Sequence, residues 1–188
     1  MEPQSTSFVL SSMNDQIRPS EPAPVWWLAV TFGTFWAGLL AHEGAHFGTL
    51  HITGLRSPMG SAVVPAAGPV MTLAIIAGCA VLVARSQRAA IKRIAFVTAA
   101  AAASRLVLTA IPTMLGGSND EHSVMLATGW PAGMIWTVEA ALTVLLLVWI
   151  VRRSGLQVRP WQGGMMLLGI FAGWTSALTF GRAIGLPI

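Results

Sequence analysis

The sequence predicts an all-α fold, a polytopic helical membrane protein with about five transmembrane helices. Of the 188 residues, 54% are hydrophobic and only 10% are charged, whereas about 25% of the residues of a soluble domain are charged. The hydrophobic residues form five long stretches, each near the roughly 20 residues that a helix needs to cross a bilayer. This composition excludes a disordered chain and an ordinary soluble enzyme.

The predicted elements follow one another without an internal repeat. Residues 1–24 are polar and lack the basic start and apolar middle of a signal peptide, so we expect a flexible polar tail. The predicted membrane helices cover about residues 25–50, 64–84, 91–115, 133–151 and 163–186. Close packing is expected at several glycines, because small residues let helix backbones approach in lipid. They are Gly33, Gly38, Gly68, Gly78, Gly169 and Gly173.

Basic residues between the stretches predict the orientation of the helices. Most of them lie in two connections, Arg85, Arg88, Lys92 and Arg93 before the third stretch and Arg152, Arg153 and Arg159 before the fifth. Because cytoplasmic loops are enriched in Lys and Arg, both connections and the N-terminus are expected in the cytoplasm, most simply at the plasma membrane. The basic residues do not cluster on a soluble face, which argues against a nucleic-acid partner.

The titratable residues beyond the tail are few, and most of the histidines and acids fall in two places. The first place, near the end of the first stretch, holds His42, Glu43, His46 and His51, and the second, after the third stretch, holds Asp120, Glu121 and His122. Glu139 stands apart, within the fourth stretch. Ionisable groups are costly in lipid and mark functional sites by default. These residues are therefore the candidates for a site.

The first group contains the motif His42-Glu43-Gly44-Ala45-His46. On a helix, residues at i and i+4 lie on one face, and two imidazoles so placed can bind one Zn²⁺. Glu43 occupies the position of the general base in a zinc peptidase. The alternative is a structural pair of interfacial histidines. His51 lies about 140° around the helix from His46, so we expect it at the interface rather than on the metal.

A catalytic zinc needs a third protein ligand and an open position for water. The distant candidates are Asp120, Glu121 and His122. In the predicted topology, the first and third stretches both run outward, so the histidine pair and these residues reach the same side of the membrane. The topology therefore allows one metal site on the outer side.

These motifs resemble those of the site-2 protease family of intramembrane zinc metalloproteases. The resemblance rests on residues 42–46 (HEGAH), on residues 66–69 (AAGP) and on residues 119–121 (NDE). It implies a core of three helices, residues 25–122, with a short β-like excursion at 52–64. It also implies that His42, His46 and Asp120 hold the zinc and that Glu43 is the general base. The acidic motif departs from the family's Leu-Asp-Gly, so Glu121 and His122 stay open as third ligands.

The expected function is hydrolysis of peptide bonds in membrane-embedded or membrane-adjacent substrates. Residues 123–188 form two additional transmembrane helices that the minimal core lacks. The alternatives are a non-catalytic multi-pass membrane protein, such as a small transporter or assembly factor that carries a metal site, and a zinc peptidase of another membrane family. Inside the fourth stretch, Glu139 is expected to have a structural role, either paired with Arg105 or Arg182 or protonated and hydrogen-bonded. The oligomeric state stays open.

Overall fold

The fold is described by a computed structural model over residues 21–54, 62–115 and 119–181. Every regular element in these ranges is helical, which confirms the all-α prediction. The helices are α2 (Pro24–Thr53), α3 (Val63–Arg85), α4 (Ala89–Met114), α5 (Asp120–Thr128), α6 (Ala132–Ser154) and α7 (Pro160–Ser176), and the π-helical turn η2 (Ala177–Gly181) continues α7. The predicted tail falls almost entirely outside the described residues.

Four of these helices are long and apolar enough to cross a membrane, which indicates a membrane protein. They are α2, α3, α6, and α7 together with its continuation as far as Phe180. Helix α4 has 26 residues, a length of about 39 Å at 1.5 Å per residue. Its membrane crossing, and with it the number of five spans, stays a prediction.

The helix bounds follow local sequence signals. Helix α2 begins at Pro24, because proline lacks an N–H and is tolerated in the first turn. It ends before Gly54, whose φ of 66° is the left-handed conformation that glycine adopts readily. Residues 55–61 lie outside the described residues, and with them most of the predicted β-like excursion. On either side of that gap, Thr53 and Val63 are helical.

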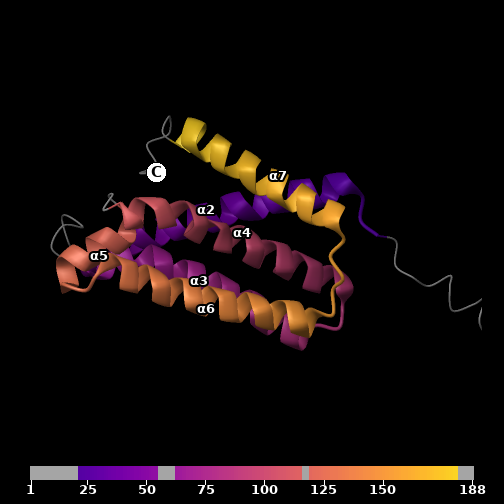
Figure 1. The fold of residues 1–188 in the computed structure, drawn as a ribbon, viewed down its shortest axis with the longest axis horizontal. Helices are drawn as coiled ribbons and strands as arrows, with labels where there is room; N and C mark the ends of the chain where they lie inside the picture. The colour runs from indigo at the N-terminus through magenta and orange to yellow at the C-terminus, as the bar shows by residue number, and fades with distance from the viewer. Residues whose placement is uncertain (1–20, 55–61, 116–118, 182–188) are drawn as a thin grey trace, which may run out of the picture.

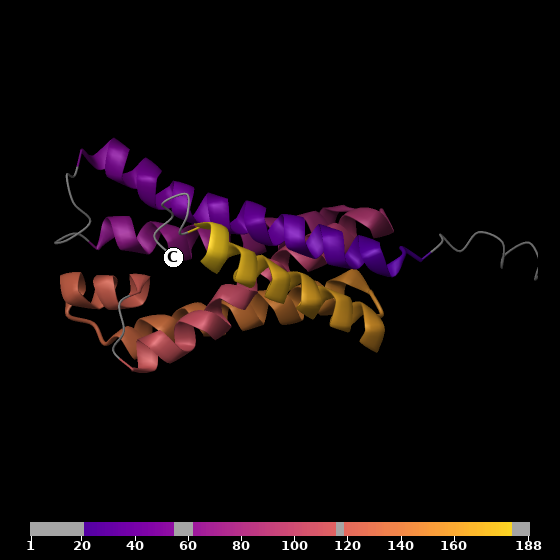
Figure 2. The ribbon, with the colours of Figure 1, turned by 90° about the horizontal axis from the view of Figure 1, so that it is seen from above.

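The long helices pack side by side in a bundle, and α7 lies along α2 (Figure 1). Helix α2 contacts α3, α4 and α7, while α3 contacts α4 and α6. The connections from α3 to α4 and from α6 to α7 lie at one end of this bundle, and α5 lies at the opposite end (Figure 1). The view from above shows α5 next to the end of α3 that lies away from the N-terminal trace (Figure 2).

Glycine packing is confirmed at two positions where α7 meets α2. A Cβ on Gly169 would lie 2.8 Å from the Cβ of Thr31, and one on Gly173 would lie 2.6 Å from Cγ of Phe35. The prediction is wrong for Gly33, Gly38 and Gly78, because a Cβ at any of them would meet no atom within 4 Å among the described residues. These three glycines face away from neighbouring helices.

Helix α5 is an element that the sequence analysis did not predict. Asn119 caps its N-terminus by accepting a 2.8 Å hydrogen bond from the backbone N–H of His122. Asp120 and Glu121 occupy the first turn, where negative charge interacts favourably with the helix dipole. The cap fixes Asp120 as the first helical residue.

Candidate metal centre

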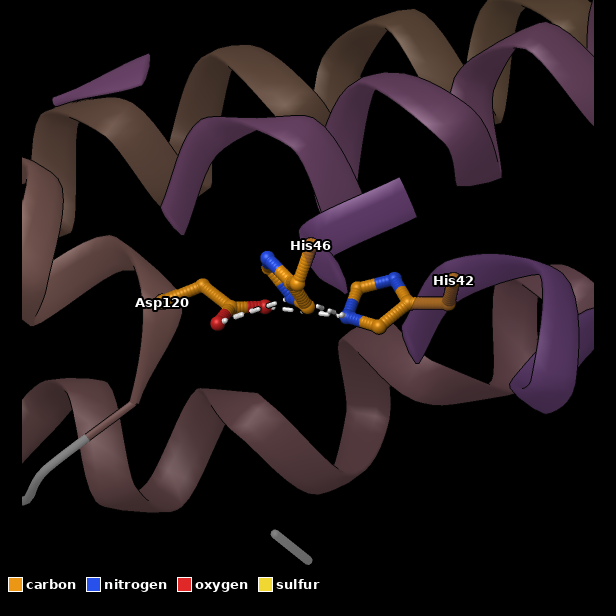
Figure 3. A group of neighbouring side chains, drawn as sticks. All are labelled: His42, His46 and Asp120. Carbon is orange, nitrogen blue, oxygen red and sulfur yellow. Dashed lines mark hydrogen bonds and ion pairs between the residues drawn. The ribbon is translucent and has the colours of Figure 1, made fainter. Parts of the chain in front are cut away.

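Two histidines and one aspartate converge where α2, α3 and α5 meet. Figure 3 shows that the imidazoles of His42 and His46 point toward the carboxylate of Asp120. Nε2 of His42 lies 3.0 Å from Oδ2 of Asp120, and Nε2 of His46 lies 3.4 Å from Oδ1. The two Nε2 atoms are 3.3 Å apart. The structure therefore brings the two predicted ligands on α2, His42 and His46, together with Asp120, one of the three candidates for the third ligand.

The other nitrogen of each imidazole is held by α3. Nδ1 of His46 lies 2.7 Å from the carbonyl oxygen of Val64, which can only accept a hydrogen bond. Nδ1 of His42 lies 3.1 Å from Oγ1 of Thr72, and this hydroxyl donates its own hydrogen to the carbonyl of Gly68 at 3.2 Å. We therefore assign the hydrogen to Nδ1 in both neutral rings, which leaves a lone pair on each Nε2.

With these tautomers, the three converging groups are all hydrogen-bond acceptors. Two imidazole lone pairs and a carboxylate would then face one another at 3.0–3.4 Å with no hydrogen between them. A cation at the centre of this group would accept the lone pairs of both imidazoles and of the carboxylate. Two neutral histidines and one carboxylate form a common three-ligand set for a catalytic zinc, and acceptors on Nδ1 orient ligating imidazoles in metal sites. The residues therefore fit a divalent metal ion.

Gly68 of α3 provides the space in front of the two imidazoles. A Cβ built on this residue would overlap Nε2 of both His42 and His46, and also Cε1 of His42. A side chain at this position would therefore occupy the region toward which both lone pairs point. The sequence analysis assigned Gly68 only to helix packing.

Glu43 lies beside the group on the same turn of α2. Its side chain is buried, and it is close enough to His42, His46 and Asp120 to interact with them electrostatically. Among the residues that the structure describes, it has no hydrogen-bond or ion-pair partner. A buried carboxylate with free oxygens next to a three-ligand group is suited to accept a proton.

Arg105 joins the candidate ligand Asp120 to two further acids. Its guanidinium donates to Asp120 at 2.8 Å, to Glu121 at 3.1 Å and to Glu139 at 2.9 Å. The pairing of Glu139 with Arg105 is thus confirmed, and Arg182 lies outside the described residues. Burial alone would raise the pKa of Asp120. The close contacts with His42 and His46 and the charge of Arg105 nevertheless hold that pKa well below its usual range.

The remaining candidates are not brought into the metal group. Glu121 is fully buried, contacts Arg105 and leaves its Oε2 without a partner among the described residues. His122 contributes its backbone N–H to the cap of α5, and the side chain of His51 is exposed on the last turns of α2. The group that the described residues form consists of His42, His46 and Asp120.

Several functional contacts could not be found from the sequence motifs. Thr72 and the carbonyl of Val64 have no distinctive pattern, because an acceptor for Nδ1 is fixed only by the packing of α3 on α2. Arg105 did have a signal, since a lone arginine in an apolar stretch needs a partner. That signal did not indicate Asp120 as one of its partners.

Comparisons with protein-family models, with curated proteins and with solved structures find no match to this chain.

Proposed function

We propose that this protein is an intramembrane zinc metalloprotease that hydrolyses peptide bonds of membrane-embedded or membrane-adjacent substrates. One observation carries the proposal. The Nε2 atoms of His42 and His46 and the carboxylate of Asp120 converge within 3.0–3.4 Å, while both Nδ1 atoms are held by acceptors on α3. A histidine pair that served only as interfacial anchors would not need this orientation on both rings.

The proposed roles follow from the geometry. His42, His46 and Asp120 would hold the zinc ion, which when bound acts as a Lewis acid that polarises a carbonyl group and activates water near neutral pH. The carboxylate of Glu43 takes a proton from the attacking water and delivers it to the nitrogen of the leaving amine. Arg105 holds Asp120 in its ionised form, which is the form that binds a metal.

The proposed location is the plasma membrane with the N-terminus in the cytoplasm. The two Arg-rich connections lie at one end of the bundle and α5 lies at the other (Figure 1). With these connections in the cytoplasm, as the positive-inside rule predicts, the metal group would lie near the outer side. The four apolar helices support a substrate that meets the enzyme in or beside the bilayer. A fifth span by α4 is part of this proposal.

The protease activity is tested with Glu43→Gln. The substitution keeps the shape of the side chain but removes the base, so cleavage of membrane-anchored peptides should fall by about 100- to 10,000-fold while zinc stays bound. Glu21→Gln is the matched control, because Glu21 pairs with Arg159 far from the metal group. The measurements are the cleavage rate in proteoliposomes and the zinc content of the same samples.

Equal activity of Glu43→Gln and the wild type would contradict the mechanism. Zinc binding by the wild type without cleavage of any membrane peptide would instead favour the second function, a non-catalytic membrane protein that carries a metal site.

A further inference from the structure

A buried network of four charged side chains joins α4, α5 and α6 behind the metal group. The side chain of Arg105 on α4 is 12% exposed, Glu121 on α5 is fully buried and Glu139 on α6 is 5% exposed. Asp120 is the fourth member and faces the two histidines. Buried charges are costly unless they are paired, so a network of this size inside an apolar bundle needs an explanation.

We propose that Arg105 is a positioning residue of the metal centre, and that Glu139 holds it in place. The inference rests on the metal site of the proposed function but not on proteolysis. In this arrangement α6 contributes to the metal centre through the contact of Glu139 with Arg105.

The guanidinium of Arg105 fixes the orientation of the Asp120 carboxylate. Nη2 of Arg105 donates to Oδ2 of Asp120 at 2.8 Å, and this same oxygen lies 3.0 Å from Nε2 of His42. The other oxygen, Oδ1, faces Nε2 of His46. Binding one oxygen from behind fixes the rotation of the carboxylate, so that both oxygens face the two imidazoles. Arginine is suited to this because its donors form a rigid planar fork.

Helix α6 forms two hydrogen bonds with α4, at Arg105 and at the next residue. Nη1 of Arg105 donates to Oε1 of Glu139 at 2.9 Å. One turn earlier on α6, the indole N–H of Trp136 donates to the carbonyl oxygen of Leu106 at 3.2 Å. These two bonds reach adjacent residues of α4. The bond from Glu139 holds the tip of the Arg105 side chain, whereas the bond from Trp136 joins the two helices without contacting that side chain.

The network contains more acidic than basic side chains. Three carboxylates face one guanidinium, and one oxygen each of Glu121 and Glu139 has no partner among the described residues. A cation bound at Asp120 would offset part of this negative charge. The network and the metal ion should therefore stabilise each other.

The experiment measures metal binding by the full-length protein in detergent. Arg105→Gln and Glu139→Gln are compared with the wild type in two ways, by zinc affinity from competition with a chromophoric chelator and by the visible absorption spectrum of the Co²⁺-substituted protein. We expect zinc affinity to fall by about 10- to 100-fold in Arg105→Gln, as for other residues that orient a metal ligand. The Co²⁺ bands should shift in both variants.

Trp136→Phe is the matched control, since it removes the neighbouring bond between α6 and α4 without changing the charges. It should lower the melting temperature of the metal-free protein but leave the zinc affinity and the Co²⁺ spectrum unchanged. If Arg105→Gln does not fold, Glu139→Gln decides, because it keeps the arginine and removes the negative charge of the group that holds it. Wild-type affinity and an unshifted spectrum in a folded Arg105 or Glu139 variant would overturn the proposal.

Failure of the positioning role and failure of the protease proposal give different results. A wild-type protein that binds zinc tightly and cleaves nothing would refute proteolysis but leave the Arg105 comparison intact. A protein that cleaves peptides and whose Arg105→Gln variant binds zinc normally would refute only the positioning role.

Discussion

His42 and His46, the two proposed ligand histidines, each use one ring nitrogen for an acceptor on α3 and direct the other toward Asp120. This division depends on the partners at Nδ1, because the carbonyl of Val64 and the already-donating hydroxyl of Thr72 both require a hydrogen from the ring. Both Nε2 atoms are then left as electron-pair donors in the space in front of Gly68. The chemistry of the site is thus decided by residues outside the motif at 42–46.

The space in front of Gly68 leads to a direct prediction. Gly68→Ala places a methyl group against both Nε2 atoms, so zinc binding should be lost even though alanine favours the helix by about 1 kcal/mol over glycine. Gly78→Ala is the control on the same helix, because a Cβ there meets nothing within 4 Å among the described residues. Zinc titration of the two purified variants is the measurement, and tight binding by Gly68→Ala would contradict the assignment of this space to the metal.

At the scale of the elements, the long helices could be predicted and the short one could not. The five apolar stretches became α2, α3, α4, α6 and α7 within a few residues at most ends, because length and hydropathy are properties of the local sequence. Helix α5 was missed, since nine residues with four polar ones at the start look like a loop when the cap at Asn119 is not recognised. The orientation of Gly33 and Gly38 was also missed, because one sequence does not show which side of a helix meets a neighbour.

The cap of α5 is expected to position Asp120, and substitutions at Asn119 test this. Asn119→Ala removes the side chain that accepts from the N–H of His122, at a cost of about 1 kcal/mol for the first turn of α5. Because Asp120 is the first residue of that turn, zinc affinity should fall by up to about fivefold. Asn119→Ser keeps a capping oxygen and should bind zinc like the wild type, as measured by chelator competition. Equal affinities for the alanine and serine variants would show that the cap does not position Asp120.

At the scale of the whole molecule, the bundle brings together residues that are far apart in the chain. His42 and Asp120 are separated by 78 positions, and the structure joins them because α5 folds back against α3, which packs on α2. The sequence could predict that both clusters reach one side of the membrane. It could not choose among Asp120, Glu121 and His122, because that choice depends on the direction of each side chain on a helix that was not predicted.

The same arrangement explains why the region after residue 122 matters for the site. Helix α6 packs on α3, α4 and α5 and contributes the carboxylate that pairs with Arg105. From the sequence, residues 123–188 are expected to lie outside the core of three helices, and a boundary at residue 122 stays a prediction. The contact between Glu139 and Arg105 nevertheless links the later helices to the metal group through one ion pair.

The central claim is that His42, His46 and Asp120 form one metal centre, and the zinc content of the purified protein tests it most directly. The wild type is expected to carry about one zinc ion per chain by elemental analysis. His46→Ala and Asp120→Ala, purified in the same way, should each lose most of it, while His51→Ala should retain it because His51 lies outside the group. Absence of zinc from the wild type, or wild-type zinc content in both His46→Ala and Asp120→Ala, would contradict the claim.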